Sequence, residues 1–421
     1  MSTARARGEA LRRARTRARA APSGRRKAKS AIATPAQSAR RYETVALVLQ
    51  GGGALGAYQC GIYEALHRAG IQPSWFAGTS VGAINAAILA GNAPAKRIER
   101  LHEFWNTVCE PAGTFAWSSA TALRDAIAWL PPSTLFSAWM GALSAFGALA
   151  QGQRGFFVPR RMPPFAEPPG TAAATSFYDT APLRATLEKL VDFDRINADG
   201  VRLTVGATHI ASGNFRYFDS ATERIGPEHI MASGALPPAF PAVVIDGEAY
   251  WDGGVVSNTP LEHVLESNPR RDTLAFEVDL WSARGIVPRT LLDVLERAKD
   301  IQFSSRTRLG TDAVAARQRL RNALGLLLEE IPPRDLPKKL VAELEPWLCD
   351  RVFNIVHLIY RAKPYEEQFK DYAFGRSAMR EHWAAGVDDM THTLERPEFF
   401  VPPPREIGVV THDIHRRDDG A

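Results

Sequence analysis

The stretch from Ala77 to Ala87 constrains the fold of this chain more than any other. It reads Ala-Gly-Thr-Ser-Val-Gly-Ala-Ile-Asn-Ala-Ala and predicts a short buried strand, a tight corner and a helix of small side chains. Gly78, Ser80 and Gly82 form a Gly-x-Ser-x-Gly pattern, which at a strand-to-helix corner is a nucleophile elbow. Free N–H groups at the start of the helix would favour an alkoxide on this serine.

A glycine-rich loop precedes this stretch. The apolar run Val45–Leu49 is typical of a strand that is buried on both faces of a parallel sheet. It continues into Gln50–Gly56 and then into a predicted helix over residues 57–69. A strand, a glycine loop and a helix start together make a cradle of backbone N–H groups for an anion.

Two uses of such a loop compete. Gly51, Gly53 and Gly56 match the dinucleotide-binding fingerprint, which also needs an acidic residue about 20 positions on to hold the ribose. No Asp or Glu occurs between Glu64 and Glu99, so we expect no nucleotide cofactor. The other use is to donate N–H groups to the oxyanion of an acyl transfer, beside a nucleophilic serine.

An acidic residue stands at the end of a later predicted strand. Residues 249–251 lead directly into Asp252, and Gly253 and Gly254 clear space beside it. A Thr-Pro pair then begins a helix. Open α/β sheets place their active-site groups at such strand ends.

These motifs resemble those of one protein family. The glycine loop Gly51–Gly56, the elbow Gly78–Gly82, the segment Ala232–Pro241 and the acidic motif at Asp252 occur in the order and spacing of patatin-like phospholipases. The resemblance covers about residues 42–280, and the combination is far more specific than any one motif. It implies a three-layer α/β/α sandwich around a mostly parallel sheet, and a lipid acyl hydrolase with a lipid substrate.

The resemblance also implies roles for individual residues. Ser80 would be the nucleophile, Asp252 the general base, and the amides of Gly51, Gly52 and Gly53 the oxyanion hole. The other motif positions are the glycines Gly56, Gly78, Gly82, Gly253 and Gly254. Many members of the family carry Arg or Lys just before the last glycine of the loop, whereas this chain has Leu55, and Gly254 stands where Ala is also common.

A dyad of this kind needs an unusually basic carboxylate. A free aspartate has a pKa of about 3.9, which makes it a poor base for a serine hydroxyl. A dry, apolar cleft would raise the pKa of Asp252, and the helix start and loop amides would stabilise the negative charge that develops.

Two other functions remain open. A Ser–acid–His hydrolase would use His263, which follows Asp252, but this histidine falls inside a predicted helix over residues 259–266. A catalytically inactive lipid-binding module is the alternative from a different class. The presence of Ser80, Asp252 and the glycine loop together argues against it.

The charge of the chain is concentrated at one end. Residues 1–41 hold 13 Lys or Arg and one acid, so they carry +12, and the rest of the chain carries −7. This stretch has almost no large apolar residue and predicts a disordered arm. We expect contact with anionic membrane lipid rather than nucleic acid. The arm lacks the apolar core of a secretory signal.

An apolar segment interrupts the predicted catalytic region. Residues 126–166 contain no acid, and residues 135–150 contain no charge, yet the run is too short to span a bilayer. A helical hairpin packed on the core is one interpretation. We prefer a cap or interfacial insertion over residues 115–169, with residues 135–165 in contact with the membrane surface through apolar and arginine side chains.

The remaining composition bounds the organisation of the chain. With 421 residues, we expect the arm 1–41, a catalytic domain over 42–285, a mainly helical extension over 286–404 like that of some bacterial patatin-like proteins, and a polar tail over 405–421. Cys60, Cys109 and Cys349 lie far apart, and no predicted core element contains a histidine pair at metal-ligand spacing. We therefore expect no metal. We also expect a cytoplasmic protein that binds peripherally to the membrane surface.

Overall fold

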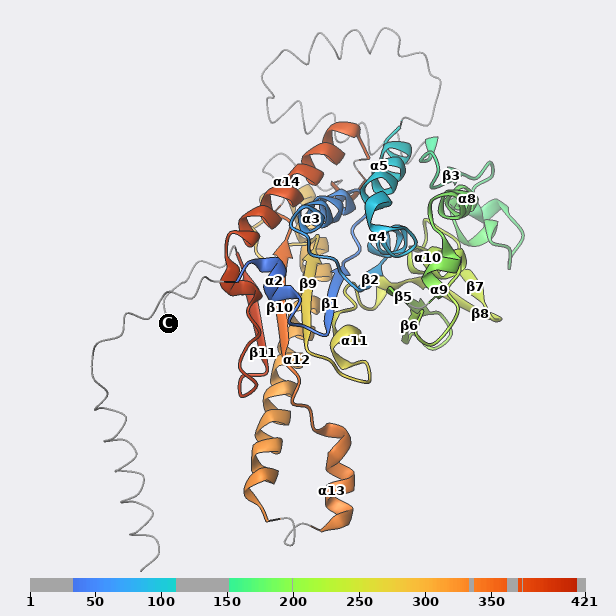
Figure 1. Cartoon of the computed structure of the whole chain (residues 1–421). Coiled ribbons are helices and arrows are strands. Elements are labelled where there is room, and N and C mark those ends of the chain that lie inside the picture. The colour runs from blue at the N-terminus through green and yellow to red at the C-terminus, as the bar shows by residue number, and fades with distance from the viewer. Residues whose placement is uncertain are drawn as a thin grey trace, which may run out of the picture. The chain divides into compact units, whose positions relative to one another are not determined.

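The computed structural model describes residues 33–110, 151–198, 200–332, 337–361, 370–372 and 374–414. These residues contain a nine-stranded sheet in the order β11-β10-β9-β1-β2-β5-β8-β7, with β6 also paired to β5 (Figure 1). The six strands from β11 to β5 run parallel, and β6, β7 and β8 are antiparallel to their neighbours. The predicted mostly parallel α/β sheet is therefore confirmed.

The strands follow the chain with helices between them. They are β1 (Thr44–Leu49), β2 (Trp75–Thr79), β5 (Arg202–His209), β6 (Phe215–Asp219), β7 (Val243–Ile245), β8 (Glu248–Asp252), β9 (Thr273–Asp279), β10 (Phe353–Ile359) and β11 (Val409–Asp413). A separate antiparallel ribbon joins β3 (Val158–Pro159) to β4 (Tyr178–Asp179).

The helices cover both faces of the sheet (Figure 1). The longer ones are α3 (Ala57–Arg68), α4 (Val81–Ala90), α5 (Arg97–Val108), α8 (Ala181–Leu190), α12 (Leu291–Glu330) and α14 (Arg376–Leu394). The shorter ones are α2 (Pro35–Ala39), α9 (Phe193–Asn197), α10 (Pro227–Ser233), α11 (Leu261–Glu266) and α13 (Lys338–Leu344). Single 3₁₀ turns include η1 (Gly53–Gly56), η5 (Gly253–Val255) and η8 (Lys370–Tyr372).

Strand β1 explains why its sequence is apolar at every position. Successive side chains of a strand point to opposite faces. Leu47 and Leu49 join the core beneath α3, α4, α5 and α14, whereas Ala46 and Val48 join the core beneath α11 and α12. Both faces of β1 are thus covered by helices, which gives the three layers of the predicted α/β/α sandwich.

The C-terminal region is built into the same body. Strands β10 and β11 extend the main sheet beyond β9, so residues predicted as an extension and a polar tail contribute to the central layer. Helix α14 packs closely on α3, because a Cβ at Gly61 would lie 2.0 Å from the carbonyl oxygen of Trp383. From Pro35 onward the described residues form one compact unit. The helical character predicted for this region is confirmed in α12, α13 and α14.

Some predictions fall outside the described residues. These are most of the basic arm, residues 115–150 of the predicted insertion and the last residues of the tail. In the part of the chain that is described, no helix is both long enough and apolar enough to cross a bilayer.

Candidate active site

Ser80 occupies the corner between β2 and α4 in a strained conformation. Its φ is 56° and its ψ is −125°, a combination that a residue with a side chain rarely adopts. The backbone N–H of Ser80 donates to Ser233 Oγ at 3.0 Å, and Ser233 Oγ donates to the carbonyl of Gly206 at 2.6 Å. Ser233 therefore holds the strained corner from α10, a role that its sequence context did not indicate.

The two glycines of the elbow are required by close packing. A Cβ at Gly78 would lie 2.3 Å from the carbonyl oxygen of Gly82, and a Cβ at Gly82 would lie 2.2 Å from that of Leu49. Neither glycine has a positive φ, so the strain of the turn falls on Ser80 itself. The elbow can close on itself and on β1 only because both positions lack a side chain.

Asp252 ends β8 next to this corner. Its side chain is buried, its carboxylate accepts a hydrogen bond from the Gly254 N–H at 2.7 Å, and the Ser80 hydroxyl lies close enough to influence the pKa of this carboxylate. Desolvation raises the pKa of Asp252 to about 7, although the Ser80 hydroxyl and the Gly254 N–H act to lower it. A carboxylate with a pKa near neutrality is a usable general base at neutral pH.

Backbone contacts fix the position of Asp252. It pairs with Ala207 of β5, and its carbonyl oxygen accepts from Thr208 Oγ1 at 3.0 Å. A Cβ at Gly253 would lie 2.6 Å from the carbonyl oxygen of Gly206, so the turn after the acid also needs a residue without a side chain. The acid is therefore carried by regular structure and held close to β5.

The glycine loop lies against the serine. A Cβ at Gly51 would approach Ser80 Cβ to 2.9 Å, and Gly53 has a φ of +55°. The Gly51 N–H donates to the carbonyl of Asn258 at 3.4 Å. Within the described ranges, nothing accepts from the N–H groups of Gly52 and Gly53, so these two amides are available to an oxyanion, whereas that of Gly51 is engaged.

Two side chains orient this loop. Asn258 Nδ2 and Trp281 Nε1 donate to the carbonyl oxygen of Gly51 at 2.9 and 2.8 Å. The C=O and N–H of a trans peptide point in opposite directions, so both bonds turn the Gly52 N–H away from Asn258 and Trp281. The sequence analysis missed both residues, because they lie more than 200 positions from the loop.

Gln50 anchors the base of the same loop. Its Oε1 accepts from the N–H groups of Leu280 and Trp281 at 2.7 and 3.2 Å, and its Nε2 donates to Thr259 Oγ1 at 3.2 Å. A buried polar side chain directly after the apolar run of β1 was the available signal for this role. The anchor ties the glycine loop to the end of β9 and to the segment that follows Asp252.

The C-terminal region also contacts the glycine loop. The carbonyl oxygen of Asp371, in η8, would lie 2.2 Å from a Cβ at Gly53. Lys299 of α12 holds the Asp371 carboxylate at 2.7 Å. Leu55 is fully buried in the core, so this position of the loop supplies no positive charge to the active site.

His263 is bound to a different carboxylate. Its Nε2 lies 2.9 Å from Asp219 Oδ2, and its ring stacks on Tyr217 with 4.3 Å between the ring centroids. Arg202 also binds Asp219, at 2.7 Å. The alternative in which His263 completes a triad with Asp252 is therefore contradicted by the geometry.

Two models of protein families match this chain. The family model described as patatin-like phospholipase matches residues 47–265, and one described as patatin phospholipase matches residues 301–406. No curated protein matches the sequence. The solved structures that match include VipD from Legionella pneumophila, with a TM-score of 0.36 and 15% identity over 84% of this chain and 67% of that chain.

Proposed function

The chain belongs to the patatin-like phospholipase family, and we propose that it hydrolyses carboxylic esters of lipids with Ser80 as nucleophile and Asp252 as general base. Family membership supports a lipid acyl hydrolase in general terms. The finer assignment rests on one observation: the buried Asp252 carboxylate lies close enough to the Ser80 hydroxyl for this hydroxyl to lower its pKa, while burial raises that pKa to about 7.

The acylation step follows from these positions. Asp252 takes the proton of Ser80 while Oγ attacks the ester carbonyl, and the resulting oxyanion accepts hydrogen bonds from the Gly52 and Gly53 amides. The Val81 N–H is a third donor, because the first amides of a helix have no partner within the helix. Collapse of the intermediate breaks the ester C–O bond, and Asp252 returns its proton to the alcohol that leaves.

Deacylation repeats the same transfers with water. Asp252 takes a proton from the attacking water, the tetrahedral intermediate forms again, and its collapse releases a fatty acid and restores the Ser80 hydroxyl. A single carboxylate serves both steps because its pKa lies close to neutral pH and it can accept and return a proton.

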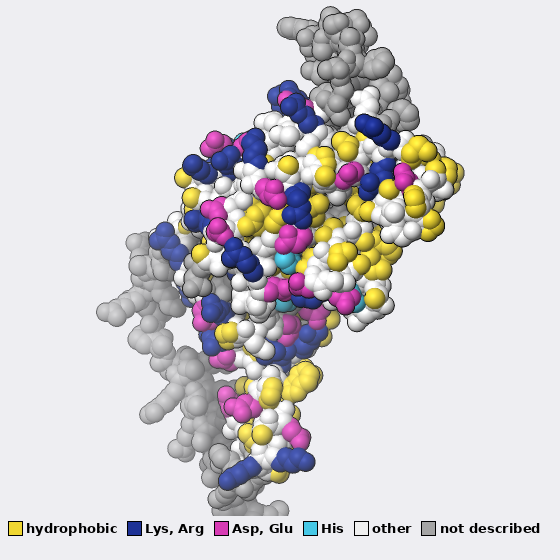
Figure 2. Space-filling model, turned by 90° about the vertical axis from the view of Figure 1, so that its right-hand side faces the viewer, with side chains coloured by type: hydrophobic (Ala, Val, Ile, Leu, Met, Phe, Trp, Pro, Cys, Tyr) yellow, Lys and Arg dark blue, Asp and Glu magenta, His cyan; other side chains and the backbone are white. Residues whose placement is uncertain are grey.

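Peripheral contact with the membrane is part of this proposal. Figure 2 looks onto the side of the protein that carries β3 and α8 in Figure 1, where hydrophobic side chains gather on the surface. Phe165 is 88% exposed and Met162 52% exposed, and Arg161 lies beside Met162 in the chain. Exposed apolar and basic side chains together favour binding to anionic lipid.

Phe165→Glu should reduce co-sedimentation with phosphatidylglycerol vesicles, whereas Ile286→Glu, at another exposed apolar residue, should not.

Labelling with a fluorophosphonate tests the nucleophile. The wild type should be labelled and should release fatty acid from phospholipid vesicles, and Ser80→Ala should do neither. Ser377→Ala, at an exposed serine of α14, is the matched control and should behave as the wild type. Fatty acid release by Ser80→Ala at the wild-type rate would refute the assignment, and a wild type that is never labelled would favour the inactive lipid-binding module.

A further inference from the structure

A second cluster of ionisable side chains lies outside the Ser80–Asp252 site. Glu277 and Asp279 stand on β9, and His357 stands on β10 in register with Glu277. Residues two apart on a strand share a face, so all three side chains project from the same side of the sheet. One potential ligand atom from each residue lies within 4.8 Å of the others. His357 Nε2 is 2.6 Å from Asp279 Oδ2 and 3.9 Å from Glu277 Oε2.

The two carboxylates of this cluster are buried and incompletely paired. The Glu277 side chain is 0% exposed and that of Asp279 is 4% exposed. Glu277 Oε1 and Asp279 Oδ1 accept no hydrogen bond from the residues that the structure describes. A buried carboxylate oxygen without a donor is costly, and native proteins rarely leave one in this state. Both oxygens can therefore accept a cation.

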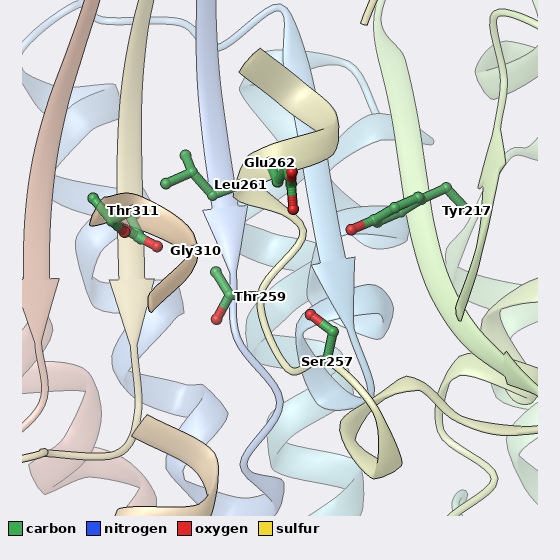
Figure 3. A pocket seen from close by; sticks show the side chains of 8 residues that line it. Tyr217, Ser257, Thr259, Leu261, Glu262, Gly310 and Thr311 are labelled. Atoms are coloured by element: carbon green, nitrogen blue, oxygen red, sulfur yellow. The ribbon is translucent and has the colours of Figure 1, made fainter. Parts of the chain in front are cut away.

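A cavity opens next to Glu277. Its volume is about 90 Å³, and its walls include the hydroxyl-bearing side chains of Ser257, Thr259 and Thr311 (Figure 3). Thr311 Oγ1 lies 3.5 Å from Glu277 Oε2. A polar cavity of this size admits water molecules. It offers both a route of entry and water ligands for an ion held at the cluster.

The donor set selects a class of ion. One imidazole nitrogen and two carboxylates suit Zn²⁺ and Mn²⁺, whereas Ca²⁺ and Mg²⁺ prefer oxygen ligands alone. We propose that Glu277, Asp279 and His357 form a binding site for a divalent transition-metal ion, with Zn²⁺ as the first choice and water from the cavity in the remaining positions. Binding would displace the proton shared by His357 and Asp279, and the ion would balance the charge of two carboxylates.

This site would brace the glycine loop from behind. Asp279 ends β9, and the next two residues, Leu280 and Trp281, donate their N–H groups to Gln50. The ion would join β9 to β10, two strands whose paired residues are far apart in the chain, and it has no part in the hydrolytic steps. The sequence predicted no metal because only the register of these strands brings His357 beside Glu277. The proposal does not rest on the proposed function.

Protons are the alternative way to balance this charge, because burial raises the pKa of Glu277 to about 8. Metal content distinguishes the two. The full-length protein is treated with chelator, loaded with ZnCl₂, passed through gel filtration and assayed by mass spectrometry for zinc. We expect one equivalent per chain and a higher melting temperature. Glu277→Gln and His357→Gln should lose that equivalent, whereas His209→Gln, at an exposed His–Glu pair, should keep it.

X-ray absorption of the zinc-loaded wild type decides the matter even if the buried variants fail to fold. The proposal predicts one imidazole ligand with oxygen in the other positions. A wild type that retains no zinc, a zinc site with sulfur or several imidazoles, or folded Glu277→Gln and His357→Gln variants that retain the full equivalent would overturn it.

Discussion

Asp252 and Glu277 are carboxylates buried in the same sheet, but their surroundings differ. Asp252 accepts a hydrogen bond from the Gly254 N–H and lies close to the Ser80 hydroxyl, whereas Glu277 Oε1 accepts no hydrogen bond from the described residues. Desolvation is the largest influence on both and raises the pKa of Asp252 to about 7 and that of Glu277 to about 8. Burial thus makes a carboxylate basic, and the donors around it decide whether it can work as a base.

The loss of the Asp252 carboxylate should have the largest effect. Asp252→Asn keeps the size of the side chain but removes the proton acceptor, so we expect kcat to fall by about 10³-fold or more. Hydrolysis of a short-chain ester measures this directly. Asp246→Asn, in an exposed turn, is the matched control and should leave kcat unchanged.

The same experiment separates the dyad from a triad. His263→Gln should keep wild-type kcat, because His263 binds Asp219. Near-native turnover by Asp252→Asn would show that Asp252 is not the general base. A collapse of turnover in folded His263→Gln would show that His263 takes part in catalysis.

The difference in stability between Asp252→Asn and the wild type should depend on pH. The folded-state pKa of Asp252 is about 7 and the unfolded value is about 3.9. As pH rises, the Asp252 carboxyl therefore loses its proton at a lower pH in the unfolded chain than in the folded one. Between these values the contribution of Asp252 to stability falls as pH rises, and above about pH 7 the full cost of burying the charge is present. Asp252→Asn should therefore gain about 2–4 kcal/mol relative to the wild type between about pH 4 and pH 8. Urea denaturation at several pH values measures the difference, and a constant difference would contradict the shift.

A smaller effect is expected at the glycine loop. Trp281→Phe keeps the aromatic ring but removes one of the two donors to the Gly51 carbonyl, so we expect kcat to fall about tenfold while KM stays unchanged. Trp347→Phe, at an exposed tryptophan, is the control. An equal rise in KM with kcat preserved would mean that Trp281 contributes to substrate binding rather than to the orientation of the loop.

The local parts of the candidate site could be predicted from the sequence. The elbow around Ser80 and the acid at Asp252 each follow a short apolar run that predicts a strand. The glycines of each motif lie within a few residues of Ser80 or Asp252 in the sequence. Asn258 and Trp281 could not be found in this way, because their hydrogen bonds to the loop join residues 207 and 230 positions apart.

For the fold as well, local elements could be predicted from the sequence but the pairing of distant strands could not. Ala46, Leu47, Val48 and Leu49 are all buried and alternate between the two cores, as one continuous apolar run predicts. This arrangement requires helices on both faces of the sheet. The attachment of β10 and β11 to β9 depends on pairing between distant segments, which no local pattern specifies. The ionisable cluster on β9 and β10 was missed for the same reason.

The pH dependence of kcat/KM tests the central claim most directly, because it reports the ionisation of the general base in the free enzyme. With a soluble ester as substrate, the account predicts that kcat/KM rises with pH and is half-maximal at about pH 7, the pKa of Asp252. A half-maximal value at about pH 4, as for an ordinary aspartate in water, would contradict it.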